Sequence, residues 1–245
     1  MYPMVHIYGH SFYTYDLINA LLAVPAIAVY FYFSLRSIGI KNSQILIFFF
    51  LGYIVEYFGG WLIPLFNRMV ILHQTQWFYT WDKPPGRYFH SVLVVYLLYT
   101  LVVCKIWRWP VWKILDRWII GVLMASAIAR FGCLIQGCCE GKLCDLPWAI
   151  RFPAQPDIAR YPTQVFMIVL ESALTFFLWR LGKKIKYDGQ VFWVGILAYS
   201  IYRYLIEYLR TNPVIFLGLT HAQLFSLVCA ELALGVLIYN RRKRA

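Results

Sequence analysis

The chain has 245 residues, of which 61% are hydrophobic and only 14% charged, and its formal net charge is +12. Composition this apolar excludes an ordinary soluble domain and predicts a polytopic membrane protein, because several stretches approach or exceed the ~20 apolar residues that span a hydrocarbon core. The positive charge does not indicate nucleic-acid binding, since the lysines and arginines are spread over short segments.

Hydropathy predicts an all-α fold with seven transmembrane helices in one integral-membrane domain, residues 1–245. No cleavable signal sequence is evident near the N-terminus, where histidines and aromatic residues replace the basic region that would precede an apolar core. The predicted spans cover residues 17–35, 44–66, 88–106, 118–137, 163–180, 190–209 and 220–240.

The distribution of lysine and arginine predicts the orientation. With the N-terminus outside, the inner segments (36–43, 105–117, 180–187 and 241–244) hold 14 of these residues and the outer segments (67–87, 138–162 and 210–219) hold 7. The positive-inside rule therefore predicts an outer N-terminus and a cytoplasmic C-terminus.

Polar residues within the early spans are the first candidates for chemistry. His90 opens the third span at its outer side, where it is either a neutral interfacial residue or a base close to a reacting group. Glu56 in the second span and Glu171 in the fifth are candidate partners for buried arginines, and several pairings stay open.

Arg130 lies near the end of the fourth predicted span. An arginine at bilayer depth costs roughly 2.5–3.5 kcal/mol on insertion scales, so a chain that keeps one usually gives it a partner or an anionic ligand. We therefore expect the chemistry of this protein near Arg130.

Four cysteines follow within twelve residues: Cys133, Cys138, Cys139 and Cys144. Their spacing does not match a zinc motif, so no metal site is predicted. A structural disulfide such as Cys139 to Cys144 is one interpretation, because thiols outside the cytoplasmic membrane tend to oxidise. A catalytic or redox thiol at Cys133, Cys138 or Cys139 is the other.

Arg203, Glu207 and Arg210 are spaced i, i+4 and i+7 in the sixth predicted span, which places them on one helix face. That face cannot contact lipid. A salt bridge at the helix end is one interpretation. The other is an anion site, because two arginines and one glutamate leave a positive excess that suits a phosphate.

Several segments in order along residues 88–226 resemble the prolipoprotein diacylglyceryl transferase family. Ala129 to Gly141 is similar to the family signature Gly-Arg-x-Gly-Asn-Phe-x-Asn-Gly-Glu, and it is followed by a similar Asp-Leu-Pro-Trp stretch at 145–148. The remaining similar segments are Phe-His-Ser (89–91), Arg-Tyr-Pro-Thr-Gln (160–164), the Arg203 to Arg210 segment, and Leu-Thr-His-Ala-Gln (219–223).

The resemblance implies a multi-pass enzyme of the bacterial cytoplasmic (inner) membrane that acts in lipoprotein biosynthesis. It would move a diacylglyceryl group from the phospholipid phosphatidylglycerol to a cysteine thiol of a lipoprotein precursor and release glycerol phosphate. No cofactor is expected.

The resemblance also implies roles for individual residues. Arg130 and Arg203 would hold the headgroup phosphate, Glu207 would orient Arg203, and His90 would accept a proton or contact the headgroup. Further substrate-binding residues are expected among those that match or flank the motifs. They are Gln136, Gly137, Gly141 and Arg210, while Gly132 keeps the signature backbone small.

The signature departs from the family pattern at two polar positions, where Cys133 and Cys138 stand for asparagine and glutamate, and Tyr161 replaces a histidine. Two other classes of function stay open. A membrane thiol oxidoreductase would explain the cysteines, and a non-catalytic seven-span protein that binds a lipid or anion would explain the buried arginines.

Overall fold

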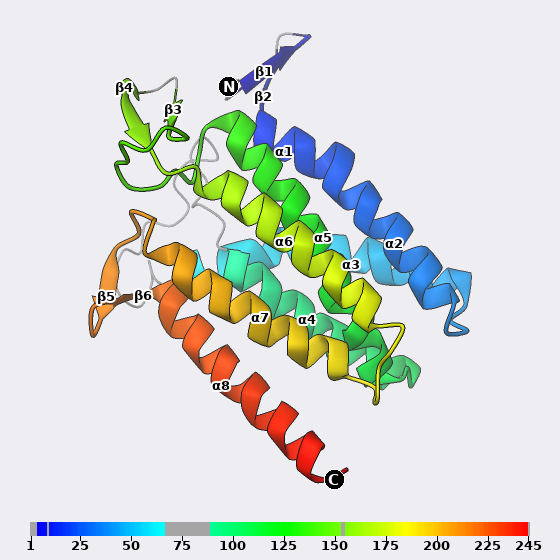
Figure 1. The fold of residues 1–245 in the computed structure, drawn as a ribbon. Helices are drawn as coiled ribbons and strands as arrows, with labels where there is room; N and C mark the ends of the chain where they lie inside the picture. The colour runs from blue at the N-terminus through cyan, green and yellow to red at the C-terminus, as the bar shows by residue number, and fades with distance from the viewer. Residues whose placement is uncertain (1–3, 9, 67–88, 153–154, 245) are drawn as a thin grey trace. The chain divides into compact units, whose positions relative to one another are not determined.

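The computed structural model describes residues 4–8, 10–66, 89–152 and 155–244 (Figure 1). At residues 7, 56–57, 60–66 and 89–91 only the backbone is described, so the side chains of His90 and Glu56 lie outside the described part. The chain divides into two compact units, one of Met1–Ser34 with Leu115–Ala245 and one of Leu35–Ile114. Whether they form the single domain expected from the sequence stays a prediction.

The first unit is built mainly of helices. A continuous helix runs through α1 (Thr14–Ile18), a π-helical turn (Asn19–Ala23) and α2 (Val24–Arg36), whose last residues belong to the second unit. It is followed in the chain order of this unit by α5 (Val111–Gln136), α6 (Thr163–Leu181), α7 (Gln190–Glu207) and α8 (His221–Arg242).

Three antiparallel hairpins complete the first unit. They pair β1 (Met4–Ile7) with β2 (His10–Tyr13), β3 (Ile150–Phe152) with β4 (Gln155–Arg160), and β5 (Val214–Phe216) with β6 (Leu219–Thr220). The hairpins β3–β4 and β5–β6 follow the ends of α5 and α7, respectively (Figure 1).

Hydrogen bonds fix the directions of the helices in the first unit. The Tyr15 backbone N–H donates to Oε1 of Gln136 (2.9 Å), while Nε of Arg117 donates to the Ser34 carbonyl (3.0 Å). The start of α1 therefore lies beside the end of α5, and the two helices run antiparallel. Their backbones approach closely, because a Cβ on Gly121 would lie 2.7 Å from the Phe31 ring.

Helices α5 and α7 run parallel, since Asp116 of α5 contacts the start of α7 and, further along both helices, a Cβ on Gly195 would lie 2.6 Å from the Ile119 side chain. Asp116 accepts from the backbone N–H groups of Gly189 (2.7 Å) and Phe192 (2.8 Å). The N–H groups of a first turn have no partner within the helix, and an anion there also meets the positive end of the helix dipole. Asp116 thus takes the place of a local N-cap, which α7 lacks.

Replacing Asp116 with alanine is expected to destabilise the protein by about 1–3 kcal/mol, because two buried N–H groups lose their acceptor. Thermal unfolding in detergent measures this, with Asp157→Ala as the matched control, since Asp157 is exposed on β4. Equal melting temperatures for the two variants would show that Asp116 does not hold α7.

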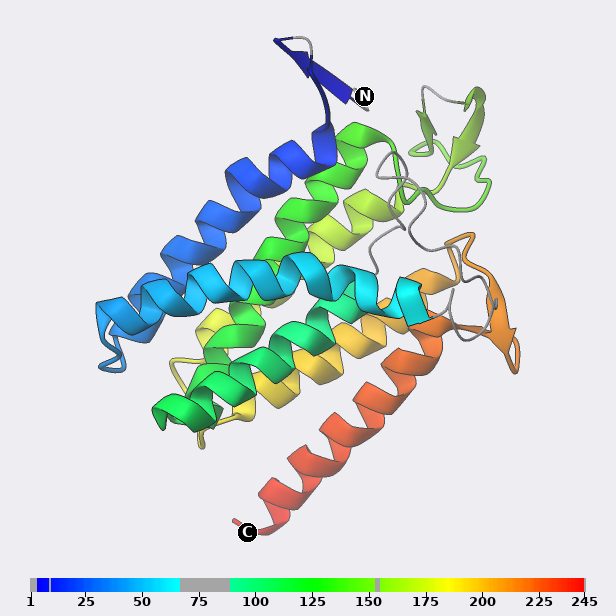
Figure 2. The ribbon, with the colours of Figure 1, turned by 180° about the vertical axis from the view of Figure 1, so that it is seen from behind.

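The second unit contains α3 (Asn42–Phe66) and α4 (Phe89–Trp107), which pack against each other (Figure 2). The Tyr99 hydroxyl donates to the Phe48 carbonyl (2.7 Å), and the two rings stack with centroids 5.2 Å apart. A Cβ on Gly52 would lie 2.9 Å from the Tyr96 ring, so the glycine permits the close helix contact.

Each of the seven predicted spans coincides with a helical segment. Within the described residues, four helices are long and apolar enough to cross a membrane: Thr14–Arg36, Val111–Gln136, Thr163–Leu181 and His221–Arg242. Their outer faces carry large exposed apolar side chains, among them Phe176 on α6 and Leu232 on α8. Apolar surface of this extent requires lipid around it, as in a multi-pass membrane protein.

Candidate functional site

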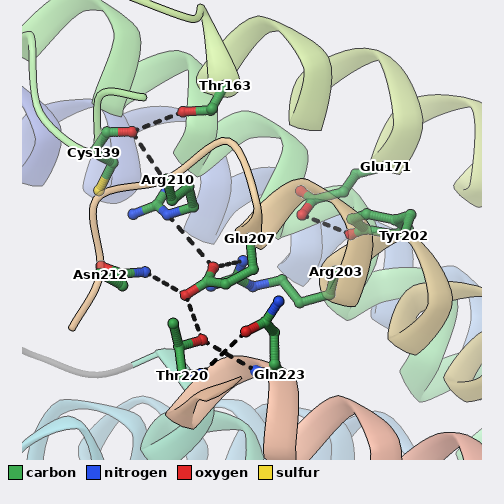
Figure 3. Close-up of polar contacts among 10 residues, drawn as sticks. All are labelled: Cys139, Thr163, Glu171, Tyr202, Arg203, Glu207, Arg210, Asn212, Thr220 and Gln223. Atoms are coloured by element: carbon green, nitrogen blue, oxygen red, sulfur yellow. Dashed lines mark hydrogen bonds and ion pairs between the residues drawn. The ribbon is translucent and has the colours of Figure 1, made fainter. Parts of the chain in front are cut away.

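Glu207, the last residue of α7, is the centre of a buried polar network (Figure 3). The residue is only 2% exposed, and its side chain accepts hydrogen bonds from three other residues. The donors are Nη1 of Arg203 (2.5 Å), Nδ2 of Asn212 (2.6 Å) and Oγ1 of Thr220 (2.9 Å). A buried carboxylate is stable only when its oxygens are satisfied in this way.

The i, i+4 and i+7 spacing predicted that Arg203, Glu207 and Arg210 lie together on one helix face. The three do lie together (Figure 3), but α7 ends at Glu207, so Arg210 reaches the carboxylate from the segment after the helix. Nε of Arg210 lies 3.7 Å from Oε2 of Glu207, and Nη1 of Arg210 donates to the Cys139 carbonyl (3.2 Å). Two guanidinium groups on one carboxylate leave a net positive charge in a largely buried place, which favours an anion.

Arg130 reaches the same neighbourhood from α5. It interacts electrostatically with Glu171 and Tyr199, and both of these also interact with Arg203. Glu171 of α6 is fully buried and accepts from the Tyr202 hydroxyl (2.8 Å). Two arginines from different helices therefore share the same electrostatic neighbours.

The chain turns sharply where α5 ends. The backbone N–H groups of Gly137 and Cys138 both donate to the Cys133 carbonyl (3.0 Å each). Gly137 (φ +79°) and Cys139 (φ +62°) adopt left-handed conformations, which suit glycine and cost a cysteine some strain. This turn folds the signature segment back over the end of its own helix.

Contacts with the start of α6 hold the turn in place. Nε2 of Gln164 donates to the Cys138 carbonyl (2.6 Å), and Oγ1 of Thr163 donates to the Cys139 carbonyl (2.9 Å). Both donors are fully buried. The signature backbone is thus fixed by side chains of the neighbouring Arg-Tyr-Pro-Thr-Gln segment.

Gly141 lies where three segments meet. Its N–H donates to the Tyr161 carbonyl (3.2 Å), and the next N–H, of Lys142, donates to the Leu209 carbonyl (2.7 Å). A Cβ on Gly141 would lie 2.6 Å from the Tyr161 oxygen and 2.9 Å from the Leu209 oxygen. Only glycine lets the signature loop approach both backbones.

Replacing Gly141 with alanine is therefore expected to displace the loop, at a cost of about 1–3 kcal/mol in stability, and to lower activity at least about tenfold. Gly235→Ala is the matched control, because a Cβ at Gly235 on α8 meets nothing within 4 Å. Initial rates and unfolding curves of both variants test this. An active, stable Gly141→Ala protein would contradict the packing argument.

Three of the clustered cysteines converge at the turn. The Sγ atoms of Cys133, Cys138 and Cys139 all lie within 4.8 Å of one another. All six cysteines of the chain belong to the described residues, and all are free, so the Cys139 to Cys144 disulfide is not formed here. Cys144 is instead buried beside β4, where its N–H donates to the Ala159 carbonyl (3.0 Å).

The surroundings of Cys139 favour its thiolate. Its pKa lies below the ordinary value of a cysteine because the Cys133 and Cys138 thiols hydrogen-bond to its sulfur. The charges of Arg130 and Arg210 act in the same direction.

The structure brings together most of the residues that the sequence predicted for the site. Gln136 differs, since its Oε1 accepts the Tyr15 N–H and so anchors the start of α1. Gly132 also lies beside α1, because a Cβ on Gly132 would lie 3.4 Å from the Ile18 side chain. The side chain of His90, the predicted base, lies outside the described part of the chain.

Sequence reasoning missed Asn212, which follows α7 in an irregular segment and has no periodic signal. The role of Thr220 had a signal in the sequence. Thr220 and Gln223 form a capping box at the start of α8, and the pattern Thr-x-x-Gln is readable in the sequence. The same hydroxyl that caps α8 donates to Glu207, so a helix start is tied to the polar network.

Known proteins of one family resemble this chain. A family model for prolipoprotein diacylglyceryl transferase matches residues 3–239. The phosphatidylglycerol–prolipoprotein diacylglyceryl transferase of Clostridium tetani is 34% identical over 114 residues, which cover 45% of this chain and 46% of that protein.

Two further relatives carry the same name. That of Dehalococcoides mccartyi is 34% identical over 136 residues (54% of this chain, 52% of the relative), and that of Geobacter sulfurreducens is 28% identical over 200 residues (78% and 73%). The chain spans about half the length of the Clostridium and Dehalococcoides relatives that it matches. With a family match that covers nearly all of its residues, this chain belongs to the prolipoprotein diacylglyceryl transferase family.

Proposed function

We propose that this protein transfers the diacylglyceryl group of phosphatidylglycerol to the cysteine thiol of a lipoprotein precursor and releases glycerol phosphate. The observation that carries the proposal is the buried network of Arg203, Glu207 and Arg210, with Arg130 next to it. The relatives' names give the donor and the acceptor.

The reaction forms one bond and breaks one. The acceptor thiol loses its proton, its sulfur attacks the glycerol carbon that bears the phosphate, and the C–O bond breaks with its electron pair on the phosphate oxygen. The products are a thioether on the acceptor and free glycerol phosphate. Negative charge grows on the leaving phosphate, so fixed cations in a water-poor site lower the barrier.

We assign the phosphate to Arg130 and Arg203. A guanidinium group matches phosphate oxygens with two parallel N–H bonds, which a lysine cannot do. Glu207 is a positioning residue, because its carboxylate holds Arg203 at 2.5 Å and Arg210 at 3.7 Å. Gly137 and Gly141 keep the signature backbone close to the site, and His90 is the proposed proton acceptor.

We infer that the seven helical segments all span the bilayer, with the N-terminus outside and the C-terminus in the cytoplasm of a bacterial inner membrane. The directions of α1, α5 and α7 support this, because residue 15 lies beside residue 136 and residue 116 beside residue 189. Lys186 and Arg244 also contact each other, so the basic loop 180–187 and the basic tail share one end of the first unit.

Mass spectrometry tests the proposed function directly. Purified protein is mixed with phosphatidylglycerol and a peptide that carries a lipoprotein-precursor cysteine, and the peptide is expected to gain one diacylglyceryl mass as glycerol phosphate appears. A control peptide with serine at that position should stay unmodified. Lipid retention without headgroup release would identify a binding protein and contradict the proposal.

A further inference from the structure

The three thiols at the end of α5 form a cluster that the phosphate chemistry does not use. Cys133 is on the last turns of the helix, and the reversal at Gly137 brings Cys138 and Cys139 back to it. All three Sγ atoms lie within 4.8 Å of one another. The cluster is defined as these three cysteines, of which Cys133 and Cys138 stand at the two polar signature positions named in the sequence analysis.

These separations suit a metal ion. A thiolate binds zinc at about 2.3 Å, so three thiolates around one ion lie about 4 Å apart. A disulfide needs two sulfur atoms at about 2.05 Å and leaves the third thiol over. The observed spacing requires only a small contraction to hold a metal.

The surroundings keep the cluster in shape and place a positive charge beside it. The carbonyls of Cys138 and Cys139 are fixed by Gln164 and Thr163, so the ligand backbone is preorganised. Arg210 lies against the cluster, since its Nη1 donates to the Cys139 carbonyl (3.2 Å). Its positive charge offsets the negative charge that builds up when thiols lose protons to bind a metal.

We propose that Cys133, Cys138 and Cys139 bind one thiophilic d¹⁰ cation, with zinc as its representative. Sulfur ligands select such ions, whereas magnesium and calcium require oxygen. Three protein ligands leave the fourth tetrahedral position of zinc open, which is the arrangement of reactive zinc sites.

The open position has a specific use that rests on the proposed function. The acceptor is a cysteine thiol, and a thiol that coordinates zinc gives up its proton and stays a thiolate. The acceptor sulfur would form the fourth bond to the metal, release its proton to solvent or to a base, and then attack the glycerol carbon. The cluster would thus activate the acceptor beside the arginines that hold the donor.

Metal titration tests the site without lipid or turnover. Full-length protein in detergent, reduced and stripped with a chelator, is titrated with zinc against a chromophoric competitor, and cadmium reports thiolate ligands through its sulfur-to-metal absorption. We expect one equivalent of tightly bound metal. Cys133→Ser, Cys138→Ser and Cys139→Ser should each weaken binding by more than the roughly 10–100-fold loss caused by removing an outer-shell partner.

Cys144→Ser and Cys229→Ser are the matched controls, because neither sulfur belongs to the cluster. Both should bind the metal as the wild type does. No stoichiometric metal in the reduced wild type, or equal losses in the control variants, would overturn the site.

The acceptor step has its own readout. Adding the cysteine peptide to the cadmium-loaded protein should increase the sulfur-to-metal absorption, whereas the serine peptide should not. Metal binding with no response to the cysteine peptide would overturn the activation step and leave the metal site standing. Failure of the proposed function would instead appear as tight metal binding and a peptide response without any diacylglyceryl product.

Discussion

Arg203→Ala is expected to lower kcat/KM for phosphatidylglycerol by on the order of 10²–10³-fold or more, because the leaving phosphate loses a fixed cation in a buried site. Arg203 is 6% exposed and held by Glu207, so water cannot easily replace it. Initial rates with labelled lipid measure the effect. Arg203→Lys keeps the charge but loses the planar guanidinium group, so its kcat/KM should lie between those of the wild type and Arg203→Ala.

Arg180→Ala is the matched control for this prediction. Arg180 is also at a helix end, on the last turn of α6, but it is exposed and contacts the rings of Phe176 and Trp179. Its removal should leave turnover unchanged. An Arg203→Ala protein that inserts, folds and turns over lipid at the wild-type rate would exclude Arg203 from phosphate binding.

Glu207→Gln is expected to cost about 3–5 kcal/mol in stability, because it removes the negative charge that pairs with both Arg203 and Arg210 in a buried place. The glutamine keeps nearly the same shape, so the loss reports charge rather than packing. Unfolding in detergent measures it, and activity should fall at the same time because Arg203 is no longer held.

The control is Glu231→Gln, which removes the same charge from an exposed position on α8 and should change stability by less than about 0.5 kcal/mol. If Glu207→Gln unfolds at the same temperature as this control, the carboxylate does not organise the arginines. A folded Glu207→Gln protein with full activity would likewise contradict its positioning role.

The sequence predicted the helices well because their signal is local. A span of apolar residues has few alternatives, and all seven predicted ranges coincide with helical segments. The contact of Arg203 with Glu207 was predictable for the same reason, since residues at i and i+4 share a helix face. Arg210 lies beyond the end of α7 at Glu207, so its contact with the carboxylate depends on the path of the chain after the helix.

Contacts between segments far apart in the chain were not predictable from a local pattern. Asp116 holds the start of α7 across more than seventy residues, and Asn212 reaches Glu207 from an irregular segment. The thiol cluster was missed as a group because C-x₄-C-C matches no linear metal motif. It forms only through the left-handed turn at residues 137–139.

Arg130 and Arg203 are proposed to hold one phosphate together, and a double-mutant cycle of lipid binding tests this most directly. Dissociation constants for phosphatidylglycerol are measured for the wild type, Arg130→Lys, Arg203→Lys and the double variant. If both guanidinium groups bind one headgroup, the second substitution weakens lipid binding much less in the double variant than it does alone. Losses that multiply independently would show two separate sites and contradict the account.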